Sequence, residues 1–437
     1  MSKKRNQSEK PTVIEEELNT IFSAEFLEKT AKETGFIIRN RIINPLVMFW
    51  TLTFGFGVQH DRSFAGLHRL YENKAKIKLS RSSFQDRFTP KLVKFVHACV
   101  LHGMENIMQT PNLKLKDKLA SFEDILTQDS TIIRLNKKLA DKWPAARTRK
   151  VAAGVKVSLL ISAVADGPKR IALYGERTSE VKTLRIGQWV KDRILLIDLG
   201  FYKHNTFARI DENGGFFISR LKNGVNPLII KTNSVCRGRS IDIKGMRLKE
   251  ILDKLKRQVI DVEVEIVFKR RKYNGKQSKD VKCFRLIAIY NIEDEKYHVY
   301  ITNIPADRLN AEDIAVLYSA RWEIELIFKE LKSRYGIDNL TTSNPHAVEA
   351  LLWVSILTLI VSRRVYRLVY SANLEKAPRY THLRWATIFA EKSLELLDDI
   401  LDYVGIDTEP MGLFEIFQSQ ALDPNVNRKR LMDIWRA

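Results

Sequence analysis

The sequence predicts an α/β protein with a β-rich middle between two helical regions. Three observations support this class. Residues 1 to about 118 and about 346–437 carry apolar side chains at helical spacing. Residues 119–300 instead contain short apolar runs and alternating apolar and polar positions, which are typical of strands. Residues 315–336 return to a helical period, with charged side chains beside the apolar face.

The N-terminal region is predicted to be helical, with a basic link over residues 74–83. Ser80 or Ser82 is the expected N-cap of the helix after this link, because a serine hydroxyl accepts a hydrogen bond from a free backbone N–H there. Such a pair of helices could dock in a DNA groove, or it could be part of a plain helical bundle. The side chains that would face DNA are Arg81, Ser83, Gln85 and Arg87.

Two strand-like segments each carry one aspartate. Asp129 lies in the apolar segment 124–135, and Asp198 directly follows the apolar run Ile194–Ile197, which predicts a strand buried on both faces. A carboxylate in such surroundings is costly unless a partner or a metal compensates its charge, so the two aspartates suggest a shared metal site. Asp166 differs, because it stands in a short sequence typical of a hairpin turn.

Residues 223–300 predict a mostly β segment. Residues 261–268 alternate apolar with mainly charged side chains, and Asn274-Gly275 is a strong hairpin signal before the next strand. The turn is crowded with cations, which could lie along a DNA backbone or only keep a solvated edge from pairing. These cations are Lys269, Arg270, Arg271, Lys272, Lys276, Lys279 and Lys282.

The helix predicted over residues 315–336 presents a polar stripe. Tyr318, Arg321, Glu325 and Lys332 fall within an arc of about 60° when each residue turns the helix by about 100°. A carboxylate can ligate a metal there while the arginine and the lysine bind phosphate. An ordinary surface helix could carry the same residues, because Arg321 and Glu325 stand four residues apart and can pair.

These three segments together resemble the DDE transposases of bacterial insertion sequences, in the insertion-sequence-four family, whose signature is this Y-x2-R-x3-E-x6-K helix. Asp129-Ser130-Thr131 is similar to the family's D-[GS]-[ST] strand, and Asp198-Leu199-Gly200-Phe201 to its D-x-G-[YF] strand end. The resemblance implies two sets of site residues. The triad that binds metal would be Asp129, Asp198 and Glu325, and the auxiliary ligands of the DNA backbone would be Tyr318, Arg321 and Lys332.

The resemblance also implies an RNase H-like catalytic core interrupted by a mostly β insertion. The segment between Asp198 and Glu325 is too long for a single crossover, whereas the shorter segment between the two aspartates suits a hairpin and a connection. The expected organisation has five parts. They are a helical, DNA-end-binding region at 1–118, the first part of the core at 119–222, the insertion at 223–300, the second part of the core at 301–345 and a helical region at 346–437.

As a member of this family, the protein would cleave and join DNA with two Mg2+ ions, or with Mn2+ in their place. Its partners would be the terminal inverted repeats of its own element and the target DNA, and it would act as a homodimer on DNA. The family moves DNA by cut and paste, often through a hairpin intermediate. Some members stack an aromatic residue of the insertion on a flipped base, and the comparable strand here offers Tyr297 or His298 instead of the usual tryptophan.

The composition agrees with a nucleic-acid partner. The 73 basic and 52 acidic residues give a net charge of +21, and 45% of the 437 residues are hydrophobic, which is ordinary for a globular chain. The three scattered cysteines fit a reducing cytosol, and no structural zinc is expected at His97, Cys99 and His102. The N-terminus has no apolar segment typical of a signal peptide.

The apolar stretch 350–362 is shorter than the roughly 20 residues that a bilayer requires, so we expect a buried core helix and no membrane partner. The expected location is the cytoplasm of a prokaryote, at the nucleoid. Two alternatives remain open at this point. One is an inactive or domesticated descendant that only binds DNA, and the other is an RNase H-like nuclease without joining activity.

Overall fold

The computed structural model describes most of the chain, and its described residues form two compact units. The described residues are 13–38, 43–58, 63–77, 79–109, 114–146, 152–233, 235–236, 239–240, 242–252, 258–270, 272, 274–376 and 379–406. The first unit, here called the helical unit, takes its described residues from Met1–Thr110, Ile132–Val155 and Leu326–Lys429. The second, here called the sheet unit, takes them from Pro111–Thr131 and Lys156–Glu325.

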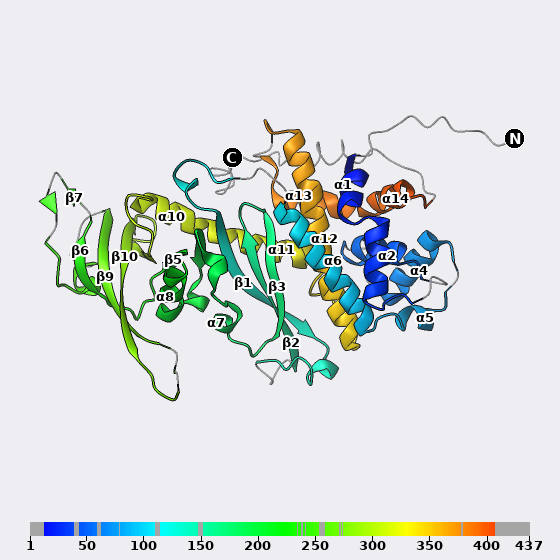
Figure 1. The fold of residues 1–437 in the computed structure, drawn as a ribbon, viewed down its shortest axis with the longest axis horizontal. Coiled ribbons are helices and arrows are strands. Elements are labelled where there is room, and N and C mark those ends of the chain that lie inside the picture. Colours follow the sequence, from blue (N-terminus) through cyan, green and yellow to red (C-terminus); the bar gives the residue numbers. More distant parts are fainter. Residues whose placement is uncertain are drawn as a thin grey trace. The chain divides into compact units, whose positions relative to one another are not determined.

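The helical unit consists mainly of α-helices from both ends of the sequence (Figure 1). Its N-terminal elements are α1 (Val13–Ile21), α2 (Ala24–Glu33), α3 (Pro45–Thr51), the π-helical turn η1 (Leu52–Phe56), α4 (Phe64–Ala75), α5 (Arg81–Gln85) and α6 (Pro90–Gln109). Its C-terminal elements are most of α11 (Glu323–Ser333), α12 (Pro345–Ala372), α13 (His382–Glu391) and α14 (Ser393–Tyr403). The helical prediction is confirmed wherever these regions are described; residues 1–12 and 407–437 lie outside the described residues.

The predicted basic link is followed by a short helix rather than a long one. Ser80 is the N-cap of α5, and its hydroxyl accepts a hydrogen bond from the Ser83 backbone N–H at 3.2 Å. The helix ends at Gln85 and α6 begins at Pro90, so three helices occupy the segment where two were predicted. Phe84 anchors α5, because its side chain is fully buried.

Helix α12 is the buried centre of the helical unit. By length and composition it could cross a membrane, but 83% of its most apolar window is buried inside the protein. It packs against α6 and η1, where the Thr358 hydroxyl donates to the Thr53 carbonyl at 2.8 Å. This burial agrees with the predicted core helix.

The sheet unit is built on one nine-stranded mixed sheet with the order β3-β2-β1-β4-β5-β11-β10-β9-β6. Its strands are β1 (Asp124–Leu135), β2 (Ala153–Ser162), β3 (Gly167–Gly175), β4 (Arg193–Ile197), β5 (Phe216–Arg220), β6 (Leu228–Thr232), β9 (Val259–Lys269), β10 (Lys279–Asn291) and β11 (Lys296–Thr302). A two-stranded sheet pairs β7 (Val235–Cys236) with β8 (Arg239–Ser240). The other helices of this unit are α7 (Glu180–Thr183), α8 (His204–Glu212), α9 (Leu248–Leu252) and α10 (Ala311–Ser319).

The predicted strands and turns of the sheet unit are confirmed. The turn between β2 and β3 has Asp166 at φ +47°, and the turn between β9 and β10 has Asn274 and Gly275 at φ +47° and +74°. Strand β10 pairs with β9 on one side and with β11 on the other, and β11 pairs with β5. The strands of residues 223–300 therefore continue the same sheet that carries the two aspartates.

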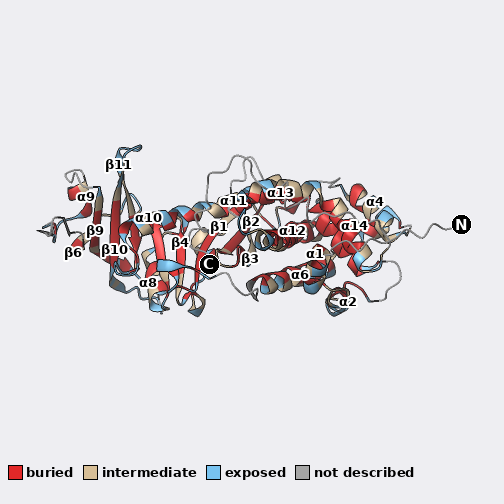
Figure 2. Ribbon diagram, turned by 90° about the horizontal axis from the view of Figure 1, so that it is seen from above, coloured by how far each residue is buried: buried red, intermediate tan, exposed pale blue. Residues whose placement is uncertain are grey.

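Helices cover both faces of this sheet (Figure 2). On one face, Phe207 and Ile210 of α8 share a hydrophobic core with Leu195 and Ile197 of β4. On the other face, the apolar side of α10 packs on Ile194 and Leu196 of the same strand. Alternate residues of β4 thus point to opposite faces, as the period of a strand requires.

The predicted continuous helix over residues 315–336 is wrong in one respect. Helix α10 ends at Ser319, a 3-10 turn η6 follows at Ala320–Trp322, and α11 begins at Glu323. Tyr318 lies in the last turn of α10, and Arg321 lies in the 3-10 turn that follows it. The turn directs both residues toward the end of β4, as the contacts below show.

Candidate active site

Asp129 and Asp198 occupy equivalent positions on two neighbouring parallel strands. Strand β1 pairs with β4 in an unbroken register, from Asp124 opposite Arg193 to Thr127 opposite Leu196. Extended toward the carboxyl ends of the strands, the same register sets Asp129 opposite Asp198. Neighbouring strands lie about 4.8 Å apart, which brings the two carboxylates together where β4 ends, while β1 continues to Leu135.

The helical segment that packs on this face brings Arg321 and Glu325 to the end of β4. The Arg321 Nε lies 3.6 Å from Asp198 Oδ1, and its Nη2 donates a hydrogen bond to Glu325 Oε1 at 2.9 Å. Tyr318 is buried, with its ring 5.4 Å from that of Tyr300 and its hydroxyl 3.5 Å from the carbonyl oxygen of Ile197. The segment α10–η6–α11 is therefore attached to the end of β4 at Ile197, through Tyr318, and at Asp198, through Arg321.

The charges at the end of β4 perturb one another. Burial, together with the negative charges of Asp198 and Glu180, raises the pKa of Asp129 to about 6, although a hydrogen bond from the Ser130 backbone N–H and the charge of Arg321 act the other way. Burial alone would lower the pKa of Arg321, but its hydrogen bond to Glu325 and the charge of Asp198 hold that pKa above the ordinary value. Burial raises the pKa of Tyr318 to about 12, so its hydroxyl stays protonated.

The donor chemistry at the end of β4 fits a divalent hard cation. Asp129, Asp198 and Glu325 offer only carboxylate oxygens, which are the ligands that Mg2+ and Mn2+ prefer. Burial is the main cause of the raised pKa of Asp129, and the negative charges of Asp198 and Glu180 add to it; a bound cation would favour the ionised carboxylate instead. Among the described residues no three acidic, histidine or cysteine side chains lie close enough together to hold a metal ion, and Arg321 contacts both Asp198 and Glu325.

Glu180 is the site residue that the sequence analysis missed. It opens the short helix α7, and its Oε1 accepts a hydrogen bond from the Ser130 hydroxyl at 3.3 Å. It also lies close enough to Asp129 to raise the pKa of that carboxyl. Its position between β3 and β4 was the only available signal, and nothing else in the sequence separates it from the other acidic residues.

The other predicted DNA ligands lie elsewhere. Lys332 is half-buried, on the part of α11 that belongs to the helical unit. Arg81 is exposed on the first turn of α5, and Arg87 is half-buried beside a cavity of about 720 Å³ that is lined by residues 35–38, the segment after α5 and the start of α6. These two arginines therefore lie at opposite ends of one short helix.

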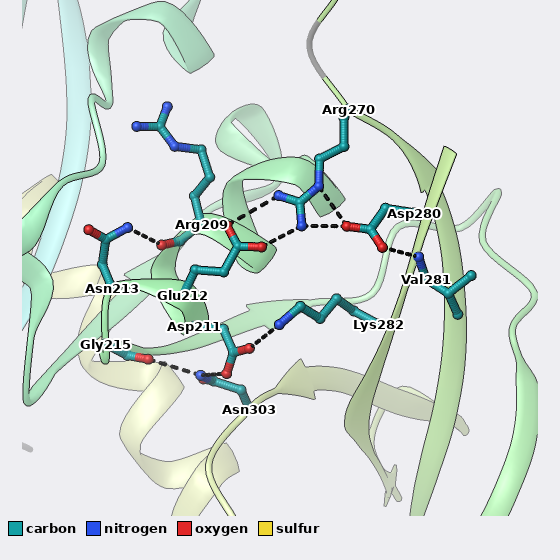
Figure 3. Close-up of polar contacts among 10 residues, drawn as sticks. All are labelled: Arg209, Asp211, Glu212, Asn213, Gly215, Arg270, Asp280, Val281, Lys282 and Asn303. Carbon is teal, nitrogen blue, oxygen red and sulfur yellow. Dashed lines mark hydrogen bonds and ion pairs between the residues drawn. The ribbon is translucent and has the colours of Figure 1, made fainter. Parts of the chain in front are cut away.

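The cations of the β9–β10 turn differ in how they are held (Figure 3). Arg270 donates hydrogen bonds to Asp280 at 2.7 Å and to Glu212 at 3.2 Å, and Lys282 pairs with Asp211 at 2.8 Å. Arg270 can reach DNA only by giving up these two carboxylate partners. Lys272 is exposed, and Arg271 lies outside the described residues.

The aromatic candidates on β11 are also held by protein partners. The ring of Tyr297 lies 5.2 Å from that of Tyr290, and His298 Nε2 is 2.7 Å from Asp294 Oδ2. Both contacts lie on the β10–β11 hairpin.

Comparison with known proteins identifies the chain. Residues 120–361, more than half of the chain, match the family described as "Transposase DDE domain". The transposase for insertion sequence element IS231E of Bacillus thuringiensis subsp. finitimus is 24% identical over 394 residues, covering 79% of this chain and 78% of that protein. The transposase for insertion sequence element IS1151 of Clostridium perfringens is 22% identical over 375 residues, with the same two coverages.

A solved structure, the cryo-EM structure of piggyBac transposase synaptic complex with hairpin DNA, aligns with 95% of this chain and 86% of that one. The TM-score of 0.45 and the identity of 11% are too low to support an argument about this fold.

A strand end with several carboxylates on a strongly basic chain defines the class as a metal-dependent enzyme that acts on DNA. The chain belongs to the transposase DDE domain family. It is a DNA transposase, an enzyme that cleaves DNA and transfers strands, and its family implies a divalent metal cofactor.

Proposed function

We propose that Asp129, Asp198 and Glu325 are the DDE triad of this transposase and that the end of β4, where they meet, is the site of DNA cleavage and joining. The observation that carries the proposal is the register of β1 with β4, whose continuation sets the two aspartates side by side on parallel strands. Glu325 joins them through Arg321, which contacts both Asp198 and Glu325. The core around this site is then the RNase H-like core of the insertion-sequence-four family.

The triad would hold two Mg2+ ions, or Mn2+ in their place. Bound ions would stabilise the attacking and leaving oxygens of a phosphodiester displacement. The residues of the chain itself orient the substrate. Arg321 would turn from its carboxylate partners toward a DNA phosphate when the ions supply positive charge, and Lys332 would bind the backbone further along α11.

We further propose the five-part organisation given above, with Arg81 and Arg87 in the region that binds the DNA ends. In the basic turn, Arg271 and Lys272 would contact the DNA backbone, and Arg270 would join them only where DNA displaces Asp280 and Glu212. The net charge of +21 supports binding along an extended stretch of duplex. The substrates would be the terminal inverted repeats and the target DNA, inside a prokaryotic cytoplasm.

Cleavage of the element's own ends tests this function. The purified protein, incubated with Mg2+ and duplexes that carry those ends, should cut them and then join the freed 3′ ends to target DNA. Asp198→Asn should bind the same duplexes but neither cut nor join them. Cutting without joining would favour the nuclease, and binding by the wild-type protein without cutting would favour an inactive descendant.

The assembly that we propose is a homodimer on two DNA ends, because cut-and-paste transfer must hold both ends together. The high positive charge opposes self-association until DNA neutralises it. Light scattering should therefore give a monomer without DNA and a complex of two proteins with two end duplexes. A cleavage-competent complex of one protein with one end would contradict the dimer.

A further inference from the structure

Glu180 lies against residues that stand next to each of the two aspartates of the proposed triad. One of its carboxylate oxygens accepts from the hydroxyl of Ser130, the residue that follows Asp129. The other oxygen lies against Gly200, two residues after Asp198: a Cβ atom added at Gly200 would stand 2.0 Å from Glu180 Oε2 and 3.8 Å from Asp198 Oδ2. Glu180 thus reaches the middle of β1 and the segment just after β4 at once.

Gly200 leaves the space that Glu180 occupies. The backbone at Gly200 is not in the left-handed region, so its conformation does not require glycine. What a side chain would displace is the carboxylate of Glu180, the far end of a flexible side chain. The absent Cβ is therefore explained by the close approach of Glu180 to the end of β4.

The segment that carries Glu180 is fixed at both ends by polar contacts to the sheet. The buried ammonium of Lys156 on β2 donates to the carbonyl oxygen of Thr178 at 2.6 Å. The buried amide of Gln128, which precedes Asp129, donates to the Thr183 hydroxyl at 3.1 Å. These contacts hold Glu180 in place before any substrate or metal binds.

Among the residues that the structure describes, no lysine or arginine forms an ion pair with Glu180. Asp198 and Glu325, by contrast, share the guanidinium of Arg321. A carboxylate held beside two other carboxylates requires positive charge from another source. A divalent cation supplies that charge and accepts carboxylate oxygens as ligands.

We propose that Glu180 is a fourth carboxylate of the metal site and binds the divalent cation together with Asp129 and Asp198. The proposal rests on the triad proposed above. It assigns Gly200 a role as well, because a glycine at that position lets the fourth carboxylate reach the site.

Binding of Mn2+ to the metal-free, full-length protein tests this role without reference to activity. Titration followed by the EPR signal of free Mn2+ should show an affinity at least about tenfold weaker for Glu180→Gln, since even residues behind a metal ligand contribute about 10- to 100-fold. The melting temperature without metal should be unchanged or higher, because one of several like charges is removed. The rise in melting temperature on adding Mn2+ should shrink.

Glu293→Gln is the matched control, because Glu293 is an exposed glutamate of the same unit and the variant loses the same charge. Gly200→Ala should also weaken Mn2+ binding, since the new methyl group displaces the Glu180 carboxylate. An affinity for Glu180→Gln within about threefold of the wild-type value overturns the proposal and leaves Glu180 a role only in holding Ser130. Asp198→Asn distinguishes a failure of the proposed triad from a failure of the Glu180 proposal alone. Normal Mn2+ binding by that variant overturns the triad, and the role of Glu180 with it.

Discussion

Two arginines of the sheet unit each lie between two carboxylates, yet their surroundings give them different roles. Arg321 has 16% of its side chain exposed and stands beside Asp129, a further carboxylate whose pKa is raised to about 6. Arg270 has 24% of its side chain exposed, pairs with Glu212 and Asp280, and lies over the Phe268 ring; the adjacent Lys282 pairs with Asp211. Two cations thus meet three carboxylates around Arg270, whereas among the described residues Arg321 is the cation that contacts both Asp198 and Glu325, with Asp129 close by.

This difference shows why an arginine between two carboxylates does not by itself indicate a metal site. At the Arg270 cluster, the hydrogen bond from Arg270 lowers the pKa of Asp280, so the ionised pair satisfies itself (Figure 3). At the Arg321 cluster, burial and two neighbouring carboxylates raise the pKa of Asp129 instead. The pKa of Asp280 falls because Arg270 binds this exposed carboxyl, whereas the pKa of Asp129 rises mainly because this carboxyl is buried, with further carboxylates beside it.

The largest difference between the two clusters should appear in DNA cleavage. Glu325→Gln keeps the size of the side chain and removes the charge that a hard cation needs, so the cleavage rate should fall by more than about 100-fold while DNA binding persists. Asp280→Asn, which also removes one carboxylate beside an arginine, should leave cleavage unchanged. Gel shifts and Mg2+-dependent cleavage of the element's ends measure both effects. Retained cleavage by Glu325→Gln would refute the role of Glu325.

The two clusters should also give opposite pH dependences of stability in the metal-free protein. The raised pKa of Asp129 means that its contribution to the free energy of unfolding is present below pH about 4 and is lost as the pH rises through about 6. The lowered pKa of Asp280 means that its contribution is present above pH about 4 and is lost as the pH falls further.

Urea unfolding of the wild-type protein, Asp129→Asn and Asp280→Asn between pH 3 and pH 7 measures these trends. Relative to Asp129→Asn, the wild-type protein should lose stability from pH 4 to pH 6. Relative to Asp280→Asn, the wild-type protein should lose stability only as the pH falls below about 4, where an ordinary aspartate takes up its proton. Adding Mg2+ should remove the first trend, because a bound cation favours the ionised carboxylate. Parallel trends at the two positions would contradict the contrast between the clusters.

Some of this site could be predicted from the sequence, because local patterns record it. The apolar runs around Asp129 and before Asp198 predict β1 and β4, and the helical spacing from Tyr318 to Glu325 predicts the segment that covers them. The 3-10 turn at Ala320–Trp322 was not predicted, since its residues fit an α-helix equally well.

Contacts between distant segments could not be predicted. Glu180 joins the site because α7 is attached to β1 and β2 through Gln128 and Lys156, and no residue spacing records those contacts. The partner of Arg270 in α8 stands far earlier in the chain, so the turn appeared to be a cluster of free cations. Charge that is neutralised across such distances is visible only in the folded protein.

The smallest expected effect concerns the salt dependence of DNA binding. Each lost phosphate contact should flatten the slope of log K against log salt by about 0.9 on duplex DNA. Arg321→Ala, Lys332→Ala and Lys272→Ala should each flatten the slope by about that amount, with little change in sequence preference. Arg270→Ala should leave the slope unchanged if its two ion pairs persist on DNA.

Fluorescence anisotropy in EDTA, where no cleavage occurs, measures these slopes between about 50 and 200 mM salt. A flatter slope for Arg270→Ala would mean that DNA breaks the ion pairs of Arg270 with Glu212 and Asp280. The β9–β10 turn would then contact the DNA backbone through Arg270. An unchanged slope for Arg321→Ala would place Arg321 outside the DNA interface and leave it only the role of balancing Asp198 and Glu325.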